Sequence, residues 1–239
     1  MRYSPPLIAA ALLVASPALA LDLRARDNQA TARARESAGG VAGYAQMARL
    51  DVKEPDGRHN RDTKDQAKSD LYQIIVYYNA AIKRDPKDDD AYFHRGIAKF
   101  FAGALVAARA DIGQANKLDP KYPYYALWID IVDKRGNVAS GLSQAITQVD
   151  MTKWPAPVIR LFLGQTTPAA VLASAEDPDP KTKQGQVCEA NFYSAELALQ
   201  QSAKQEAARL FRLAASGCPR EFVEGHAANS ELAALDVSE

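Results

Sequence analysis

The feature that most constrains the fold of this chain is a set of residue types at fixed spacing between residues 91 and 120. A large residue stands near the start of one predicted helix, small residues stand where a second helix would cross the first, and a proline follows the second helix. The residues at these positions are Tyr92, Gly96, Gly103, Ala108, Ile112, Ala115 and Pro120. Small residues let two helix backbones approach closely, and proline ends a helix because it has no N–H group. The segment therefore predicts two antiparallel helices in close contact.

The same positions recur near the C-terminus. Here they are occupied by Ala195, Ala207, Phe211, Ala214 and Pro219. Both sets have the spacing of the tetratricopeptide repeat, a helix–turn–helix unit of about 34 residues. Because a further helical pattern follows over 222–235, we expect an all-α tetratricopeptide-repeat solenoid over residues 69–236, closed by a terminal capping helix.

Other apolar patterns predict further helices around these two repeats. Apolar residues recur at helical spacing over 71–82, with Asp70 as a candidate helix start and Pro86 after the end. A helix pair is predicted over 122–149, and two short helices are predicted over 155–163 and 167–175. The charged, proline-containing segment 176–185 predicts a loop, after which the last pair begins near Val187.

The N-terminus has the pattern of a secretory signal peptide over residues 1–20. Arg2 precedes an apolar run over 7–15, and Ala18 and Ala20 are the small residues that signal peptidase recognises, so we expect cleavage after Ala20. No cysteine stands directly after that position to take a lipid anchor, and no later run predicts a transmembrane segment. Residues 21–68 predict a polar, loosely ordered segment, with a short helix over 42–50 that could cap the first repeat. The mature protein is expected to be periplasmic or secreted.

Charge and motifs exclude several classes of function. Cleavage removes one basic residue, which leaves 28 against 29 acidic residues, so nothing favours nucleic-acid binding. The histidines His59, His94 and His226 match no metal-binding or catalytic motif. The acidic run 88–90 precedes a predicted helix, where carboxylates cap backbone N–H groups. We therefore expect no catalytic residue, no metal and no cofactor.

Both cysteines of the chain lie in the C-terminal repeat. Cys188 stands at the start of its first helix and Cys218 at the end of its second. Antiparallel helices bring these ends together, so we expect a disulfide around 29 intervening residues that stabilises the fold by about 2–4 kcal/mol. The alternative is two buried thiols that pack as small hydrophobic groups.

The first helix of the repeat over 91–120 carries an apolar and aromatic set that predicts a partner groove. It consists of Phe93, Ile97, Phe100 and Phe101. We expect at least half of this set to be core, and any exposed member to contact a peptide or a partner helix. Repeat domains that clamp a terminal carboxylate carry Lys and Asn where this chain has Phe93 and Ile97, so such a clamp is disfavoured here.

Several blocks of sequence have a distinctive order and spacing. They are 92–98 (YFHRGIA), 127–129 (LWI), 154–164 (WPAPVIRLFLG), 189–193 (EANFY), 207–211 (AARLF) and 222–226 (FVEGH). These blocks resemble the NlpI family of bacterial envelope lipoproteins and its tetratricopeptide relatives. The similarity covers about residues 71–235 and includes the non-repeat insert between helix pairs. The resemblance implies a periplasmic adaptor without activity of its own that docks cell-wall hydrolases and a processing protease.

The sequence thus predicts a non-catalytic periplasmic adaptor or scaffold whose partner is a protein or peptide of the cell envelope. A chaperone-like holder of unfolded envelope proteins is the alternative, and a hydrolase with an unfamiliar site is a third reading. The pattern is also compatible with a homodimer.

Overall fold

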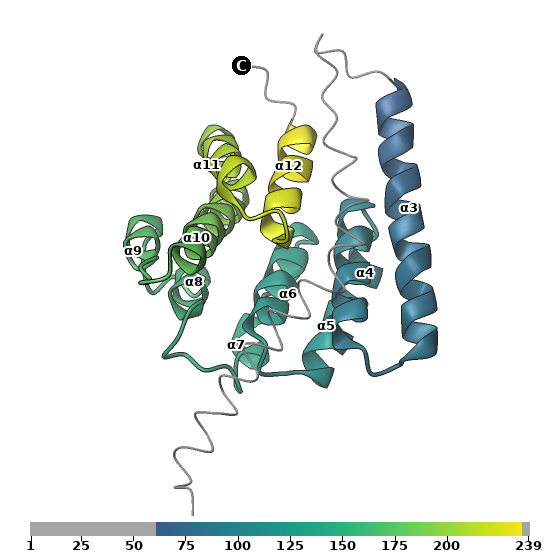
Figure 1. Cartoon of the computed structure of the whole chain (residues 1–239), viewed down its shortest axis with the longest axis horizontal. Helices are drawn as coiled ribbons and strands as arrows, with labels where there is room; N and C mark the ends of the chain where they lie inside the picture. Colours follow the sequence, from purple (N-terminus) through teal and green to yellow (C-terminus); the bar gives the residue numbers. More distant parts are fainter. Residues whose placement is uncertain (1–60, 236–239) are drawn as a thin grey trace, which may run out of the picture. The chain divides into compact units, whose positions relative to one another are not determined.

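The computed structural model describes residues 61–235, with side chains from residue 68, and all of them belong to one compact unit. These residues form ten α-helices and no strand, as the sequence predicted for the fold class (Figure 1). The helices are α3 (Arg61–Arg84), α4 (Asp89–Phe101), α5 (Leu105–Leu118), α6 (Pro123–Arg135), α7 (Leu142–Ala145), α8 (Ala156–Phe162), α9 (Pro168–Ala173), α10 (Pro180–Gln200), α11 (Lys204–Gly217) and α12 (Val223–Leu235).

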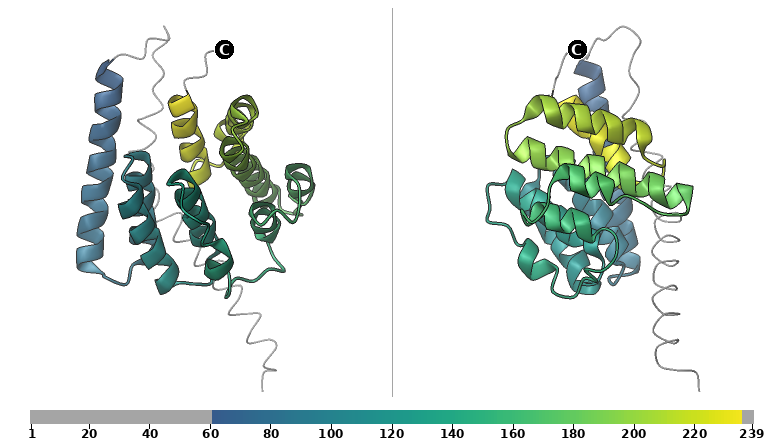
Figure 2. Two further views of the ribbon diagram at one scale, coloured as in Figure 1. Left: turned by 180° about the vertical axis from the view of Figure 1, so that it is seen from behind. Right: turned by 90° about the vertical axis from the view of Figure 1, so that its left-hand side faces the viewer.

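Most helices pack against their neighbours in the sequence. Helices α3, α4, α5 and α6 follow one another in this way, as do α10, α11 and α12. Helix α6 also contacts α10, which joins the two groups, and the short helices α8 and α9 pack on α10 (Figure 2). Local packing of consecutive helices is the arrangement expected when each unit buries its apolar face against the next.

The predicted small residues lie at the contact between α4 and α5. Ala108 and Ala115 are fully buried, and a Cβ atom added to Gly96 would lie 2.5 Å from Cγ1 of Ile112. The connection between the helices contains Gly103 with a φ of +77°, a conformation that only glycine adopts without strain. The residue types at these positions are therefore required by the backbone approach of the two helices.

The pair α10 and α11 repeats this arrangement. Ala195, Ala207, Phe211 and Ala214 are all fully buried, and Pro219 follows the end of α11. The equivalent positions of both pairs thus have the same packing role.

Two predicted helix boundaries differ from the structure. Helix α3 begins at Arg61, so residues 61–68 are helical and the buried Asp70 lies inside the helix rather than at its start. Lys, Gln and Ala favour helix even without an apolar stripe, which explains why a polar segment extends α3. Helix α10 begins at Pro180, where the Asp179 side chain accepts a hydrogen bond of 2.9 Å from the Thr182 N–H, so the predicted loop over 176–185 was too long.

The second helix predicted within 122–149 is reduced to the four residues of α7. The loop before it is held by carboxylates of α6: the Ser140 hydroxyl donates to Asp130, and the Gly141 N–H donates to Asp133 at 3.1 Å. These carboxylates give polar groups of the loop hydrogen-bond partners outside a helix, so residues 137–141 do not need to become helical. The short helices α8 and α9 were predicted correctly, including Thr167 as the cap of α9.

Aromatic rings connect the helices into one core. Trp128 of α6 lies between Phe100 of α4 at 5.8 Å and Phe192 of α10 at 5.7 Å, and Phe192 contacts Phe211 of α11 at 5.9 Å between ring centroids. Aromatic pairs at these distances contribute about 0.5–1.5 kcal/mol each beyond their buried area. The core is thus continuous from α4 to α11.

The predictions for the signal peptide, the helix over 42–50 and His59 lie outside the described residues. Within the described part of the chain, the search for a membrane-crossing helix found none of sufficient length and apolarity.

Candidate functional site

The predicted hydrophobic groove is not a groove. Phe93, Ile97 and Phe100 are buried, and Phe101 is half-buried against the core. Helix α6 covers this face of α4: the Phe93 ring lies 5.0 Å from that of Tyr125 and 6.3 Å from that of Trp128. The expectation that at least half of this set is core is confirmed. The groove prediction is wrong for Phe93, Ile97 and Phe100, because the aromatic residues of the next helix pack on this set. Tyr125 and Trp128, spaced three apart in sequence, were the signal that could have shown it.

A group of buried and half-buried tyrosines beside this core donates hydrogen bonds to carboxylates of neighbouring helices. Tyr125 donates to Asp89 of α4 at 2.8 Å. Tyr124 donates to Glu189 of α10 at 2.8 Å, and Tyr193 of α10 donates to Glu224 of α12 at 2.9 Å. We call these residues, together with Asp90 and Tyr122, the tyrosine–carboxylate cluster: Asp89, Asp90, Tyr122, Tyr124, Tyr125, Glu189, Tyr193 and Glu224.

Two tyrosines of this cluster have raised pKa values. Burial raises the pKa of Tyr125, with Asp89 adding to the effect, and burial together with Glu224 raises the pKa of Tyr193. These hydroxyls therefore remain protonated donors at neutral pH and hold the carboxylates in fixed positions. Between α4, the start of α6 and α12 the cluster borders a hollow of about 10 Å³ that Asp90, Tyr122 and Glu224 help to line, which is room for about one water molecule.

The two described histidines have structural surroundings. His94 is buried, with its Nε2 atom 3.2 Å from Oδ1 of Asp90 and its ring stacked on Tyr78 at 5.5 Å. His226 is half-buried on α12, with Nε2 3.0 Å from the Arg220 carbonyl oxygen.

Asp88 accepts a hydrogen bond of 2.9 Å from the Ala91 N–H, as expected for a helix start. In residues 61–235, no group of three or more potential ligands could hold a metal ion.

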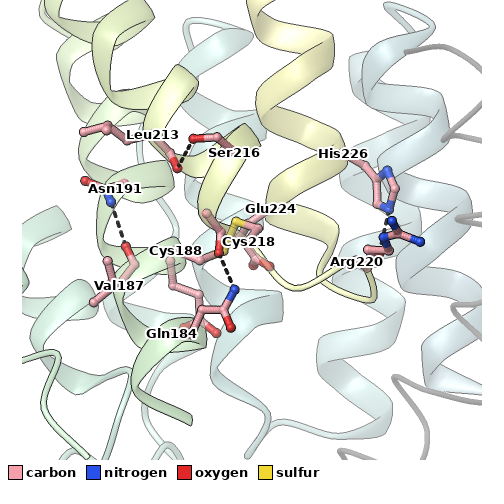
Figure 3. The surroundings of a disulfide bond; sticks show 12 residues. Gln184, Val187, Cys188, Asn191, Leu213, Ser216, Cys218, Arg220, Glu224 and His226 are labelled. Atoms are coloured by element: carbon pink, nitrogen blue, oxygen red, sulfur yellow. Dashed lines mark hydrogen bonds between the residues drawn. A yellow bond between two sulfur atoms is a disulfide. The ribbon is translucent and has the colours of Figure 1, made fainter. Parts of the chain in front are cut away.

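The disulfide predicted between Cys188 and Cys218 is present, with the α-carbons 4.8 Å apart (Figure 3). It joins Cys188 to Cys218 at the end of α11. Cys188 lies inside α10 rather than at its start as predicted, because α10 begins at Pro180. Helix α12 packs closely on the disulfide, because a Cβ atom added to Gly225 would lie 2.9 Å from Cβ of Cys218. The Gln184 side chain donates to the Gly217 carbonyl at 2.9 Å and adds a second link between α10 and α11.

A polar pocket that sequence reasoning missed lies between α8, the α9–α10 connection and α10. Its volume is about 240 Å³, and it is lined by Thr152, Lys153, Trp154, Ala156, Pro157, Arg160, Ser174, Glu176 and Gln186. We call it the α8–α10 pocket. The block of sequence that starts at Trp154 was noticed for its resemblance to a known family. It gave no indication that Gln186, more than 30 residues later in the sequence, would line the same pocket.

An ion triad of one partly exposed arginine and two buried carboxylates connects three helices beside the core. Arg135 of α6 contacts Glu196 of α10 at 3.2 Å and Glu231 of α12 at 2.9 Å, and its guanidinium lies 4.9 Å from the centre of the Phe100 ring. Burial, together with the neighbouring Glu231, raises the pKa of Glu196 to about 8. Burial also raises the pKa of Glu231. Two carboxylates share one cation, so the triad favours a bound proton.

No protein-family model matches this chain. The architecture and the surface chemistry described above therefore carry the functional argument.

Proposed function

We propose that this protein is a non-catalytic tetratricopeptide-repeat adaptor of the bacterial cell envelope that binds protein partners. The observation that carries the proposal is the recurrence of one packing pattern in two helix pairs. Gly96, Ala108 and Ala115 in α4 and α5 have counterparts in Ala195, Ala207 and Ala214 in α10 and α11. Stacked helix pairs of this kind serve mainly as extended binding surfaces.

The disulfide and the N-terminal sequence support an envelope location. Disulfides persist in oxidising compartments such as the periplasm and are rare in the cytosol. The pair Cys188–Cys218 agrees with the signal-peptide pattern of residues 1–20. Together with the resemblance to the NlpI family, this location supports cell-wall hydrolases or a processing protease as the class of partner.

The tyrosine–carboxylate cluster replaces the hydrophobic groove as the proposed partner surface. Its partly exposed members are Asp89, Asp90, Tyr122 and Tyr124, and residues of α4, α6 and α12 line its hollow. The buried members Tyr125, Glu189, Tyr193 and Glu224 hold these side chains in place through hydrogen bonds. The exposed carboxylates attract a partner segment with basic side chains, and the exposed tyrosines supply the rigid contact area typical of protein interfaces.

The test is affinity capture from a periplasmic extract of the source organism, with mass spectrometry of the bound proteins. The protein should recover one or two partners in stoichiometric amounts. Asp90→Lys should reduce this recovery at least tenfold, because charge reversal at the hollow repels a basic segment. Glu206→Lys, the same change on the exposed face of α11, is the matched control and should leave recovery unchanged.

Two results would count against the proposal. Recovery of no protein at all would refute the adaptor function. Equal recovery by the Asp90→Lys and Glu206→Lys variants, with helical content intact by circular dichroism, would refute the tyrosine–carboxylate cluster as the partner surface.

A holder of unfolded envelope proteins is a second candidate, favoured by one observation. Helix α3 exposes Tyr72, Val76 and Tyr77, which are 63%, 43% and 46% accessible. Exposed apolar residues grouped on one helix suit contact with unfolded chains. If this function holds, the protein should suppress aggregation of an unrelated reduced protein, and Val76→Asp should weaken that suppression.

A further inference from the structure

The α8–α10 pocket contains a buried hydrogen-bond acceptor that the protein leaves unused. Gln186 is only 9% exposed, and its Oε1 atom has no hydrogen-bond partner among the described residues. Such an atom costs about 1–3 kcal/mol relative to a satisfied one. The Oε1 atom itself is shut off from solvent, but Gln186 lines the pocket. A turn of the side chain that brought Oε1 into the pocket would let it accept an N–H or O–H group from a ligand and recover this cost.

The same pocket offers a cation. Arg160 lines it, donates one hydrogen bond of 2.8 Å to the Met151 carbonyl, and forms no ion pair with any described residue. Guanidinium groups bind carboxylates through paired N–H groups. Lys153 adds a second positive charge at the rim, where it pairs loosely with Asp150 at 3.6 Å.

One wall of the pocket is the indole ring of Trp154. Its N–H donates to Oε2 of Glu189 at 2.6 Å. This bond fixes the orientation of the ring and uses its single polar atom, so the rest of the indole presents apolar surface. Ala156 and Pro157 extend the apolar wall. Glu176, the acidic residue of the lining, is paired with Lys183 at 2.6 Å and is well exposed.

A carboxylate beside an N–H donor is the ligand chemistry that satisfies these groups together. We propose that the α8–α10 pocket binds the carboxyl-terminal residue of a peptide. The carboxylate pairs with Arg160, the Gln186 side chain turns so that its Oε1 atom accepts the terminal amide N–H, and the side chain of the peptide lies against Trp154. The volume of about 240 Å³ is below the roughly 300–1,000 Å³ of sites for drug-sized ligands, so it suits one or two residues. A phosphate fits less well, because its oxygens would face the Gln186 acceptor.

This inference rests on the proposed adaptor function and deepens it, since it names the end of the partner that the protein recognises. The peptide comes from one of two sources, the C-terminus of a protein or a short free peptide. Both present the same carboxylate and amide N–H, and the length of the bound peptide distinguishes them.

The experiment titrates the purified protein with N-acetyl-alanyl-alanine and follows the two indole N–H signals by NMR. The chain has two tryptophans, and only the signal of Trp154 should shift, because Trp128 is fully buried in the core. The C-terminal amide of the same dipeptide is the matched ligand and should bind at least tenfold more weakly. Arg160→Gln and Gln186→Met should each weaken binding of the acid at least tenfold, whereas Arg212→Gln on the exposed face of α11 should not.

Equal binding of the acid and the amide would overturn carboxylate recognition. The absence of any shift of the Trp154 signal at about 10 mM dipeptide would overturn the binding site. Circular dichroism checks that each variant is folded. Six-residue peptides with the same last two residues distinguish the sources. Binding at least tenfold tighter than that of the dipeptide indicates a protein C-terminus, and equal binding indicates a short free peptide. Because the titration needs no captured partner, its result is independent of the adaptor test.

Discussion

At the scale of single residues, close approach of backbones decides which side chains are tolerated. Gly96, Gly185 and Gly225 each lie where an added Cβ atom would come within 3.0 Å of another residue. The added Cβ would meet Ile112 of α5 at Gly96, and Phe222 at Gly185. At Gly225 it would meet Cys218. Phe222 and Cys218 both lie in the connection between α11 and α12. Glycine is therefore required at these positions by packing rather than by backbone conformation.

Gly96→Ala should destabilise the protein by about 1–3 kcal/mol, because the new methyl group would lie 2.5 Å from Ile112 Cγ1 and 3.2 Å from the Ala108 carbonyl oxygen. Urea unfolding followed by circular dichroism measures the change. Gly113→Ala in α5 is the control. There the new Cβ would meet only the end of the Arg109 side chain, so improved helix propensity should stabilise by up to about 1 kcal/mol. Equal stability of the Gly96→Ala variant and the wild type would contradict the close contact.

Glu196 should make the stability of the fold depend on pH. Its pKa of about 8 in the folded protein exceeds its ordinary value of 4.5, so the folded state retains a proton that the unfolded chain loses between these values. The contribution of this group is fully present below about pH 4.5 and is lost as the pH rises through 8. Glu196→Gln, which mimics the protonated form, should therefore gain stability over wild type as the pH rises, by about 1–3 kcal/mol at pH 9.

Urea unfolding of both proteins at several pH values between 5 and 9 tests this expectation. Glu206→Gln is the matched control, because Glu206 is exposed and its pKa is lowered by Arg209. Its contribution is therefore constant over this range. A constant difference between Glu196→Gln and wild type would show that Glu196 is ionised in the folded protein throughout.

At the scale of helices, the ends carry the specific interactions. Asp88, Thr167 and Asp179 cap α4, α9 and α10 through their side chains. The disulfide joins Cys218, at the end of α11, to Cys188 inside α10. Since helix ends leave backbone groups without partners, these contacts fix where each helix starts and how neighbouring ends align.

Replacement of Cys188 and Cys218 by alanine should lower stability by about 2–4 kcal/mol, because the disulfide restricts the unfolded chain over a sequence separation of 30. Thermal unfolding with and without a reducing agent measures the effect. Reduced wild type and the double variant should melt together, at a lower temperature than the oxidised protein. Identical melting of all three samples would show that the disulfide does not stabilise the fold.

At the scale of the whole described unit, two features cross from the first group of helices to the second. The aromatic chain through Trp128 and Phe192 joins α6 to α10 in the core. Beside it, Arg135 joins α6 to both α10 and α12. Because these contacts bridge the two groups, they should make α3–α6 and α10–α12 unfold as one cooperative unit.

Arg135→Met should destabilise the unit by about 3–5 kcal/mol at pH 9, because it leaves the ionised Glu196 and its neighbour Glu231 buried without a cation. The loss should shrink at pH 5, where the Glu196 carboxyl holds a proton. Hydrogen exchange should show α12 opening before the rest of the unit. Arg209→Met, which removes an exposed cation on α11, should change neither stability nor exchange. If α12 in the Arg135→Met variant were as well protected from hydrogen exchange as the other helices, the role of Arg135 in holding α12 to α6 would be contradicted.

Helical periodicity, turn residues and the repeated positions were enough to predict the all-α class, both close helix pairs and the disulfide, because these depend on neighbours near in the sequence. Gly96 and Ala108, for example, lie in consecutive helices. Helix starts were less accurate. The polar residues before Asp70 and the prolines before Gly185 are compatible with both loop and helix, and only capping and packing decide between them.

The candidate sites were decided by the tertiary structure alone. Whether Phe93 is exposed depends on Tyr125 and Trp128 of another helix. Arg160 and Gln186 line the α8–α10 pocket from separate helices, and the raised pKa of Glu196 follows from burial beside Glu231. By itself the sequence determined helix type, the repeated pairs and the cysteine pairing, since each reflects local geometry. Burial, pockets and shifted proton affinities were decided only in three dimensions, since they depend on which distant side chains exclude water from one another.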